Sequence, residues 1–147
     1  MLKEHRLPDY AAQTPIRPLF IAGEFDDWID AQPGIFDPKN GSGGRSRYEH
    51  LEQTFIDFRC DRHPLVGDLR CLMPSHKRVW SMHSPFFRIL GWVPAPHQFV
   101  AVRGVHIAQA HGANSQIDET RESVIQFAEL HLLKDTMMPG GALELFP

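Results

Sequence analysis

The sequence has few cysteines, no long apolar run and no strong excess of either charge. Two cysteines, Cys60 and Cys71, among 147 residues are too few for a disulfide scaffold, so we expect a reducing, cytoplasmic environment. No apolar run approaches the roughly 20 residues that a membrane-spanning helix needs, and the first ten residues lack the apolar segment of a secretory signal. We therefore expect no secretory leader and no membrane partner.

Several sequence motifs of common enzymes are also missing. The glycine-rich stretch at residues 37–44 is not followed by the Gly-Lys-Ser/Thr of a phosphate-binding loop, and no HExxH motif or Ser-His-Asp order is present. The apolar content of 42% and the charged content of 22% are those of a folded globular chain. We expect a single domain, because 147 residues suffice for one sizeable core.

Short apolar runs between residues 79 and 105 predict antiparallel strands. They are aromatic and β-branched, and proline-containing turns separate them. Elsewhere, apolar residues at spacings of three and four predict helices. The expected strands are Leu19–Ala22, Leu69–Met73, Val79–His83, Phe86–Val93 and Phe99–Val105, and the expected helices are Glu24–Ala31, Arg45–Arg59 and Asp118–Leu133.

The order of these elements predicts an α+β domain with helices on one face of a mixed sheet. Residues 1–14 are expected to be an N-terminal arm with little structure, residues 15–134 the core, and residues 135–147 a C-terminal tail. A longer first helix, capped by Thr14 and beginning at Pro15, is the alternative to a first strand.

Charge is distributed unevenly along the chain. Residues 45–103 carry nine basic and five acidic residues, net +4, whereas residues 1–44 have a net charge of −3 and residues 104–147 of −4. The positive part coincides with the expected sheet and suits an anionic ligand. Ordinary surface charge is the simpler explanation.

Three parts of the chain carry a resemblance to one family. They are Glu24–Asp30 (EFDDWID), the pair Val79–His83 and Phe87–Leu90, in which an arginine follows an aromatic residue, and Phe99–Val105. In this order they resemble the first-helix motif, the paired strands and the last strand of the RelE/ParE superfamily of toxins, in particular its HigB-like branch. The match extends in order from about residue 19 to residue 133.

The resemblance implies a RelE-like antiparallel-rich sheet of four to five strands, with two N-terminal helices and a C-terminal helix. It also implies a cytoplasmic toxin of a type II toxin–antitoxin pair: a metal-independent endoribonuclease that needs no cofactor, cleaves mRNA, often on the ribosome, and is held inactive by its cognate antitoxin. The chain departs from the family in its last strand, which carries only Arg103 and His106 where relatives are strongly basic. A catalytically silent RelE-fold protein that acts by protein–protein binding is the alternative.

Arg88, His83, Arg103 and His106 are the candidates for catalysis. RNA cleavage through the 2′-OH requires a base, a cation and an acid, which histidine and arginine supply without metal. Arg88 between two apolar neighbours fits either a phosphate contact or an ion pair with a helix carboxylate, and His83 could instead be a partly buried strand residue. Convergence of the four side chains on one face would favour the enzyme, and scatter over both faces would favour the binding protein.

Arg70, Lys77, Arg78 and Trp80 are the candidates for RNA binding, through phosphate contacts and base stacking. Adjacent Lys77 and Arg78 would point to opposite sides of a strand, so only one of them can face the site. Packing in the core is the alternative for Trp80, as for most tryptophans in apolar strands.

The pattern Cys60-x2-His63-x7-Cys71-x4-His76 is a rival constellation. Two thiolates and two imidazoles could hold a tetrahedral zinc ion. The second pair is loosely spaced, and inert cysteines with surface histidines are the simpler interpretation. We predict that no zinc is bound.

Overall fold

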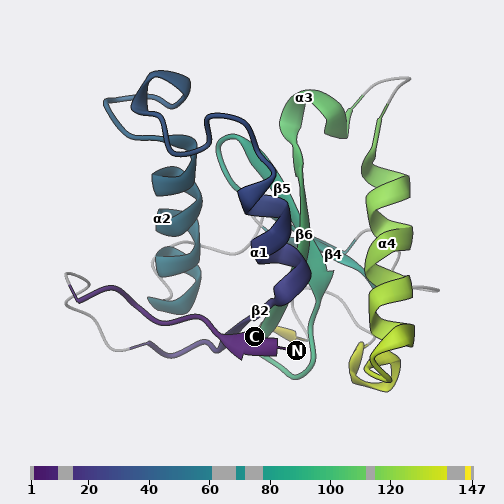
Figure 1. Cartoon of the computed structure of the whole chain (residues 1–147). Coiled ribbons are helices and arrows are strands. Elements are labelled where there is room, and N and C mark those ends of the chain that lie inside the picture. Colours follow the sequence, from purple (N-terminus) through teal and green to yellow (C-terminus); the bar gives the residue numbers. More distant parts are fainter. Residues whose placement is uncertain are drawn as a thin grey trace.

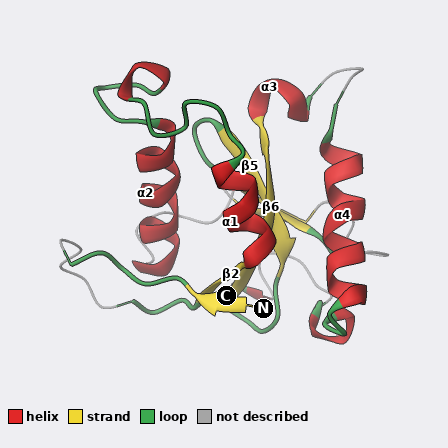
Figure 2. Cartoon of the chain, in the orientation of Figure 1, coloured by secondary structure: helices red, strands yellow, loops and turns green. Residues whose placement is uncertain are grey.

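A six-stranded mixed sheet with helices on both of its faces forms the centre of the molecule (Figure 1). The computed structural model describes residues 2–9, 15–60, 78–111, 115–138 and 145–146, and the backbone alone of residues 69–71. The described strands are β1 (Leu2–Glu4), β2 (Leu19–Ala22), β3 (Leu69–Cys71), β4 (Trp80–His83), β5 (Phe87–Trp92) and β6 (Phe99–His106). The described helices are α1 (Gly23–Asp30), η1 (Pro38–Asn40), α2 (Arg47–Cys60), α3 (Ile107–Ala110), α4 (Ile117–Leu130) and η2 (Lys134–Thr136) (Figure 2).

The strand order is β1-β2-β6-β5-β4-β3, and β2 and β6 form its one parallel pair among the described strands. In that pair Leu19 lies opposite Phe99. The β5–β6 ladder shifts register between Leu90 and Gly91. A Cβ atom at Gly91 would overlap the carbonyl oxygen of Val100, so this irregularity requires glycine.

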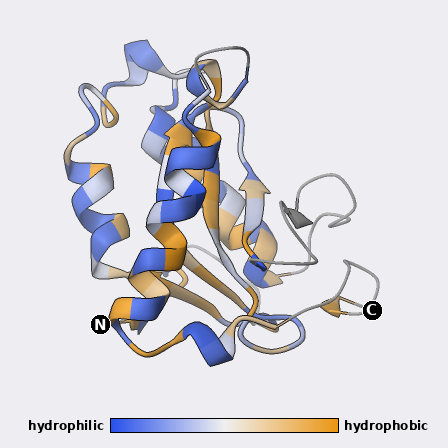
Figure 3. Cartoon of the chain, turned by 90° about the vertical axis from the view of Figure 1, so that its right-hand side faces the viewer, coloured by the Kyte–Doolittle hydropathy of each residue, from blue (hydrophilic) through white to orange (hydrophobic). Residues whose placement is uncertain are grey.

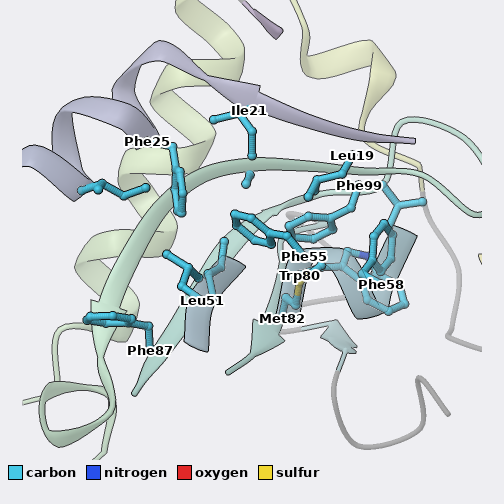
Figure 4. Packing of buried hydrophobic residues seen from close by; sticks show 14 of the residues in the cluster. Leu19, Ile21, Phe25, Leu51, Phe55, Phe58, Trp80, Met82, Phe87 and Phe99 are labelled. Carbon is cyan, nitrogen blue, oxygen red and sulfur yellow. The ribbon is translucent and has the colours of Figure 1, made fainter. Parts of the chain in front are cut away.

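Helices α1 and α2 cover one face of the sheet. Phe25 of α1 and Phe55 of α2 meet there with ring centroids 5.8 Å apart, in a core that also contains Leu19 and Phe99 of the strands (Figure 4). The members of this core are buried residues of the two helices, of four strands, of two connecting segments and of residues 145–146: Leu19, Ile21, Phe25, Ile29, Ile35, Leu51, Phe55, Phe58, Trp80, Met82, Phe87, Ile89, Val93, Phe99, Ala101, Leu145 and Phe146.

Helix α4 covers the opposite face. Its buried side chains Val124 and Phe127 pack with Leu90, Trp92 and Val102, which point away from α1 and α2. Figure 3 shows the strands coloured mostly as hydrophobic, in keeping with burial on both sides. The expectation that all helices share one face is therefore wrong, because the apolar stripe of α4 has its own sheet face to cover.

The α+β class and the mixed sheet are confirmed, and all five expected strands are present, with ends shifted by a few residues. Residues 19–22 form a strand, which excludes the longer first helix. The sixth strand, β1, comes from the arm that was expected to have little structure. It pairs antiparallel with β2, Leu2 opposite Ala22, so the arm extends the sheet.

Gly104 of β6 lies beneath the indole ring of Trp28, and a Cβ atom at this position would overlap ring atoms. We expect Gly104→Ala to lower the free energy of unfolding by roughly 1–3 kcal/mol, because the ring or the strand must move. Urea denaturation measures the change.

Gly23→Ala is the matched control, because a Cβ atom there meets no atom within 4 Å. We expect it to leave stability unchanged or to raise it by up to about 1 kcal/mol, as alanine is the better helix former. Equal stability of the two variants would contradict the proposed contact.

Candidate functional site

The four residues predicted to cleave RNA are divided between the two faces of the sheet. His83 of β4 lies opposite Arg88 of β5, and Arg103 of β6 lies opposite Leu90, so these three share the face of α4. His106 lies opposite Phe87 on the other face, and the two rings meet edge to face with centroids 5.7 Å apart. The structure therefore brings three of the four to one face and separates the fourth.

The guanidinium of Arg88 turns back onto the β4–β5 turn. Its Nη1 donates to the carbonyl oxygens of Ser84 at 3.2 Å and Phe87 at 3.4 Å. The hydroxyl of Ser84 also donates to the Phe87 carbonyl, so the turn is held from several directions. These hydrogen bonds from Arg88 stabilise the turn between β4 and β5.

Arg103 links helices on opposite sides of the sheet. Its Nη1 lies 3.5 Å from a carboxylate oxygen of Glu24 in α1 and donates to the hydroxyl of Ser123 in α4 at 3.4 Å. The side chain is 43% exposed, so the ion pair contributes little stability, on the order of 0–1 kcal/mol. Its chief effect is to fix where the guanidinium points.

His106 caps the short helix α3. Its Nδ1 accepts a hydrogen bond from the backbone N–H of Ala108 at 3.1 Å, and its Nε2 is buried without a hydrogen-bond partner among the described residues. Burial, and then the positive charge of Arg47, hold the pKa of His106 below its usual value of 6.5. Near neutral pH the ring is therefore uncharged.

The residues predicted to bind RNA do not form one surface. Arg78 is exposed and donates to the carbonyl oxygen of Met137 at 3.0 Å, in a hollow that also contains Glu122, Glu129 and Asp135. Trp80 is fully buried and packs against Phe146, so base stacking would require it to leave the core. Lys77 and the side chain of Arg70 lie outside the described residues.

The zinc pattern is described only in part. Cys60 ends α2 as a free thiol, and His63, His76 and the side chain of Cys71 lie outside the described residues. Within the part of the chain that the structure describes, no three His, Cys, Asp or Glu side chains are grouped as metal ligands.

An arginine, two imidazole rings and a phenyl ring gather near the start of α2, and we name them the Phe86 cluster: Arg47, His50, Phe86 and His106. The guanidinium carbon of Arg47 lies 5.5 Å from the centroid of the Phe86 ring. The His50 and Phe86 rings meet edge to face, with their centroids 5.4 Å apart. His106 lies beside them in the chain segment that pairs with Phe86, because the backbone N–H of Ile107 donates to the carbonyl oxygen of Phe86 at 3.0 Å. Arg47 and His50 were not singled out from the sequence, although their spacing of three residues on a helix places them on one face.

Local sequence explains how α2 presents these groups. The hydroxyl of Ser46 accepts from the backbone N–H of Glu49 at 3.1 Å, and the Glu49 carboxylate accepts from the N–H of Ser46 at 3.5 Å. This reciprocal capping starts the helix at Arg47. A cation in the first turn opposes the helix dipole, so an anion near Arg47 would relieve an unfavourable arrangement.

Comparison with known proteins found no matching family model, curated protein or solved structure. Among the residues described, no helix is long and apolar enough to cross a membrane.

The lowered pKa of His106 predicts how the ring titrates. The unfolded chain binds this proton more readily than the folded one, so the contribution to stability is present above pH 6.5 and is lost as the pH falls through the lowered value. We expect an NMR titration to give a pKa below 6.5 for His106, and Arg47→Ala to raise it part of the way, because burial remains.

Arg45→Ala is the control for this titration, since Arg45 is a nearby arginine whose guanidinium instead donates to the carbonyl oxygen of Glu49. It should leave the pKa of His106 where it is. The same shift in both variants would show that Arg47 has no specific effect.

Proposed function

We propose that this protein acts by binding a partner protein, with a RelE-like arrangement of elements, and does not cleave RNA. The observation that carries this proposal is that His106 lies on the sheet face opposite to that of Arg88, His83 and Arg103, so the four side chains do not converge on one site. A cleavage site needs a base, an acid and a cation around one phosphate. Scatter of these side chains favours the binding protein of the two alternatives.

The contacts of the individual side chains support the same proposal. Arg88 donates to turn carbonyls, and Arg103 is engaged by Glu24 and Ser123. His106 has one ring nitrogen in a cap and the other buried. Each group would have to leave a structural contact before it could reach a phosphate.

The end of α4 offers a surface for a partner. Leu130 is 78% exposed and Leu132 is 90% exposed. Leu132 also has a left-handed backbone, with φ of 58°, which a bulky residue rarely adopts. Two exposed leucines at one end of α4 support a partner contact there.

The order of elements supports a RelE-like setting for this binding. A strand is followed by two helices, then by antiparallel strands and a C-terminal helix, as the resemblance leads us to expect. The partner is then a cognate antitoxin or another cytoplasmic protein. The chain has the RelE-like fold of the toxins but lacks their catalytic activity.

A second candidate is a metal-independent endoribonuclease toxin that uses the Phe86 cluster. The favouring observation is that the Arg47 guanidinium and the His50 imidazole meet at the Phe86 ring, and that His106 precedes the residue whose N–H donates to the Phe86 carbonyl. Such groups could contact phosphate and stack a base. In this toxin His50 and Arg47 replace His83 and Arg88 in the roles expected from the sequence.

Induced expression and an RNA-cleavage assay distinguish the two candidates. We expect the purified protein to leave mRNA intact, with or without ribosomes, and expression to leave growth unchanged. The double variant Arg88→Ala, Arg103→Ala should behave like the wild type in both assays. Arg121→Ala, which removes an arginine paired with Asp118 on α4, is the control for loss of positive charge.

Cleavage by the wild-type protein that disappears in the Arg88→Ala, Arg103→Ala variant would overturn the proposal and restore the site expected from the sequence. Cleavage that disappears in Arg47→Ala and His50→Ala, and persists in the Arg88 and Arg103 variant, would establish the second candidate instead.

The left-handed conformation of Leu132 leads to a stability prediction. Its backbone N–H donates to Glu129, and the N–H of Leu133 donates to the carbonyl of Ala128 at 2.7 Å, so Leu132 occupies the helix-ending position that favours glycine. We expect Leu132→Gly to raise the free energy of unfolding by about 1 kcal/mol, because glycine adopts this conformation without strain.

Leu130→Gly is the comparison for that measurement. Leu130 is exposed but helical, so the same change should lower the free energy of unfolding by about 1 kcal/mol. Urea denaturation of both variants gives the signs. A loss of stability in Leu132→Gly would mean that the leucine side chain makes stabilising contacts.

A further inference from the structure

The edge of β6 that pairs with β2 has a strand partner along only part of its length. β2 lies parallel to β6 from Phe99 to Ala101, and α1 follows directly after β2. From Arg103 to His106 no described strand pairs with this edge, although β5 pairs with the other edge. A strand edge of this kind presents backbone N–H and C=O groups that can pair with an added strand.

Two hollows follow this edge between α1 and α4. One, of about 570 Å³, lies at the start of α1 and the end of α4, and the other, of about 350 Å³, lies at the opposite ends of the two helices. Arg103 and Ser123 line both hollows, so the two adjoin, and together we name them the β6-edge groove. Figure 1 shows β6 between α1 and α4.

The groove carries an excess of negative charge. The charged residues that line it are three carboxylates and one guanidinium: Glu24, Asp27, Glu119 and Arg103. Their sum is −2 near neutral pH, where the lowered pKa of His106 keeps its ring uncharged, and −1 if the exposed His131 carries a proton. Asp27 and Glu119 are exposed and form no ion pair with the described residues. Basic side chains therefore complement the groove.

Each wall of the groove also offers an apolar contact. Trp28 of α1 is half-buried, and Leu130 of α4 is 78% exposed. A strand added to the edge of β6 would direct its side chains alternately toward the α1 wall and the α4 wall. Both walls carry a carboxylate and an apolar side chain, so lysines or arginines that alternate with aliphatic residues suit the groove.

Arg103 lies across the groove. Its Nη1 is 3.5 Å from a carboxylate oxygen of Glu24 and 3.4 Å from the hydroxyl of Ser123, and both contacts are long for a charged donor. The side chain is 43% exposed. A basic residue of an incoming segment can therefore replace it at Glu24 while the guanidinium turns toward solvent.

We propose that the partner protein supplies a short, extended, basic segment that pairs with Arg103–His106 of β6 and lies between α1 and α4. This inference rests on the function proposed above, because it names the part of the partner that binds. The unpaired edge requires an extended backbone, and the carboxylates on both walls require basic side chains. Four residues of strand span roughly 13 Å, so a segment of about five residues is long enough.

Calorimetric titration of the full chain with the acetylated and amidated peptide Lys-Val-Lys-Val-Lys tests the proposal, at physiological ionic strength to screen unspecific attraction. We expect one peptide to bind per chain and to slow the hydrogen exchange of amides between Arg103 and His106. Two control peptides should bind about tenfold more weakly or not at all. One is Glu-Val-Glu-Val-Glu, and the other is the lysine peptide methylated at every backbone nitrogen, which keeps the charge but cannot donate to a strand edge.

Single substitutions locate the binding site. Asp27→Asn and Glu119→Gln should each weaken binding of the lysine peptide about threefold, because each removes one carboxylate of the groove. Asp30→Asn makes the same change on α1 at a residue that does not line the groove, and should leave binding unchanged. Arg103→Ala should tighten binding about threefold, because it removes the competing cation. Melting curves check that each variant is folded.

Absence of binding by the wild type, weaker binding by Arg103→Ala, or equal losses in Asp27→Asn and Asp30→Asn would overturn the proposal. Equal binding of the methylated peptide would also overturn it, because the groove would then take any linear cation, such as a polyamine. The RNA-cleavage assay decides the proposed function separately. A wild type that leaves RNA intact and does not bind the lysine peptide contradicts this inference alone.

Discussion

Burial of β6 on both faces is the constraint on which the rest of this structure depends. Its side chains are buried both against α1 and α2 and against α4, and it pairs with β2 on one edge and β5 on the other. Phe99 and Ala101 face one core, and Val100 and Val102 face the other. Both faces and both edges of β6 are covered along its first half, so a charged side chain there would be buried. The polar residues Arg103 and His106 accordingly lie in the second half of the strand, where their side chains are partly exposed.

Those polar residues are used to join elements. Where β2 ends, β6 continues beside α1, and Gly104 gives room to the indole of Trp28. Arg103 reaches from this region to both α1 and α4, and His106 ends the strand by capping α3. Arg103 and His106, which were predicted to be catalytic, thus connect the sheet to its helices. The guanidinium and the imidazole that meet at the Phe86 ring come instead from the start of α2.

The sequence predicted the helices and strands well because their periods are local. The spacing of Leu51, Phe55 and Phe58 is enough to place α2, and the apolar runs are enough to place β5 and β6. The apolar stripe of a helix does not determine which face of the sheet the helix covers. The sequence therefore led us to expect α4 on the same face as α1 and α2, which is wrong. The arm could not be foreseen either, because β1 is short and polar and its ion pairs join residues far apart in the chain. The Phe86 cluster depends in the same way on contacts between distant segments.

The central claim is that Arg88 and Arg103 are structural residues and do not share an anion site. Titration with inorganic phosphate, followed through the Nε–H NMR signals of the arginines, tests it most directly, because each guanidinium reports its own contacts. The account predicts that the signals of Arg88 and Arg103 stay fixed while phosphate is added. Shifts of both signals that saturate together at one phosphate concentration would contradict it.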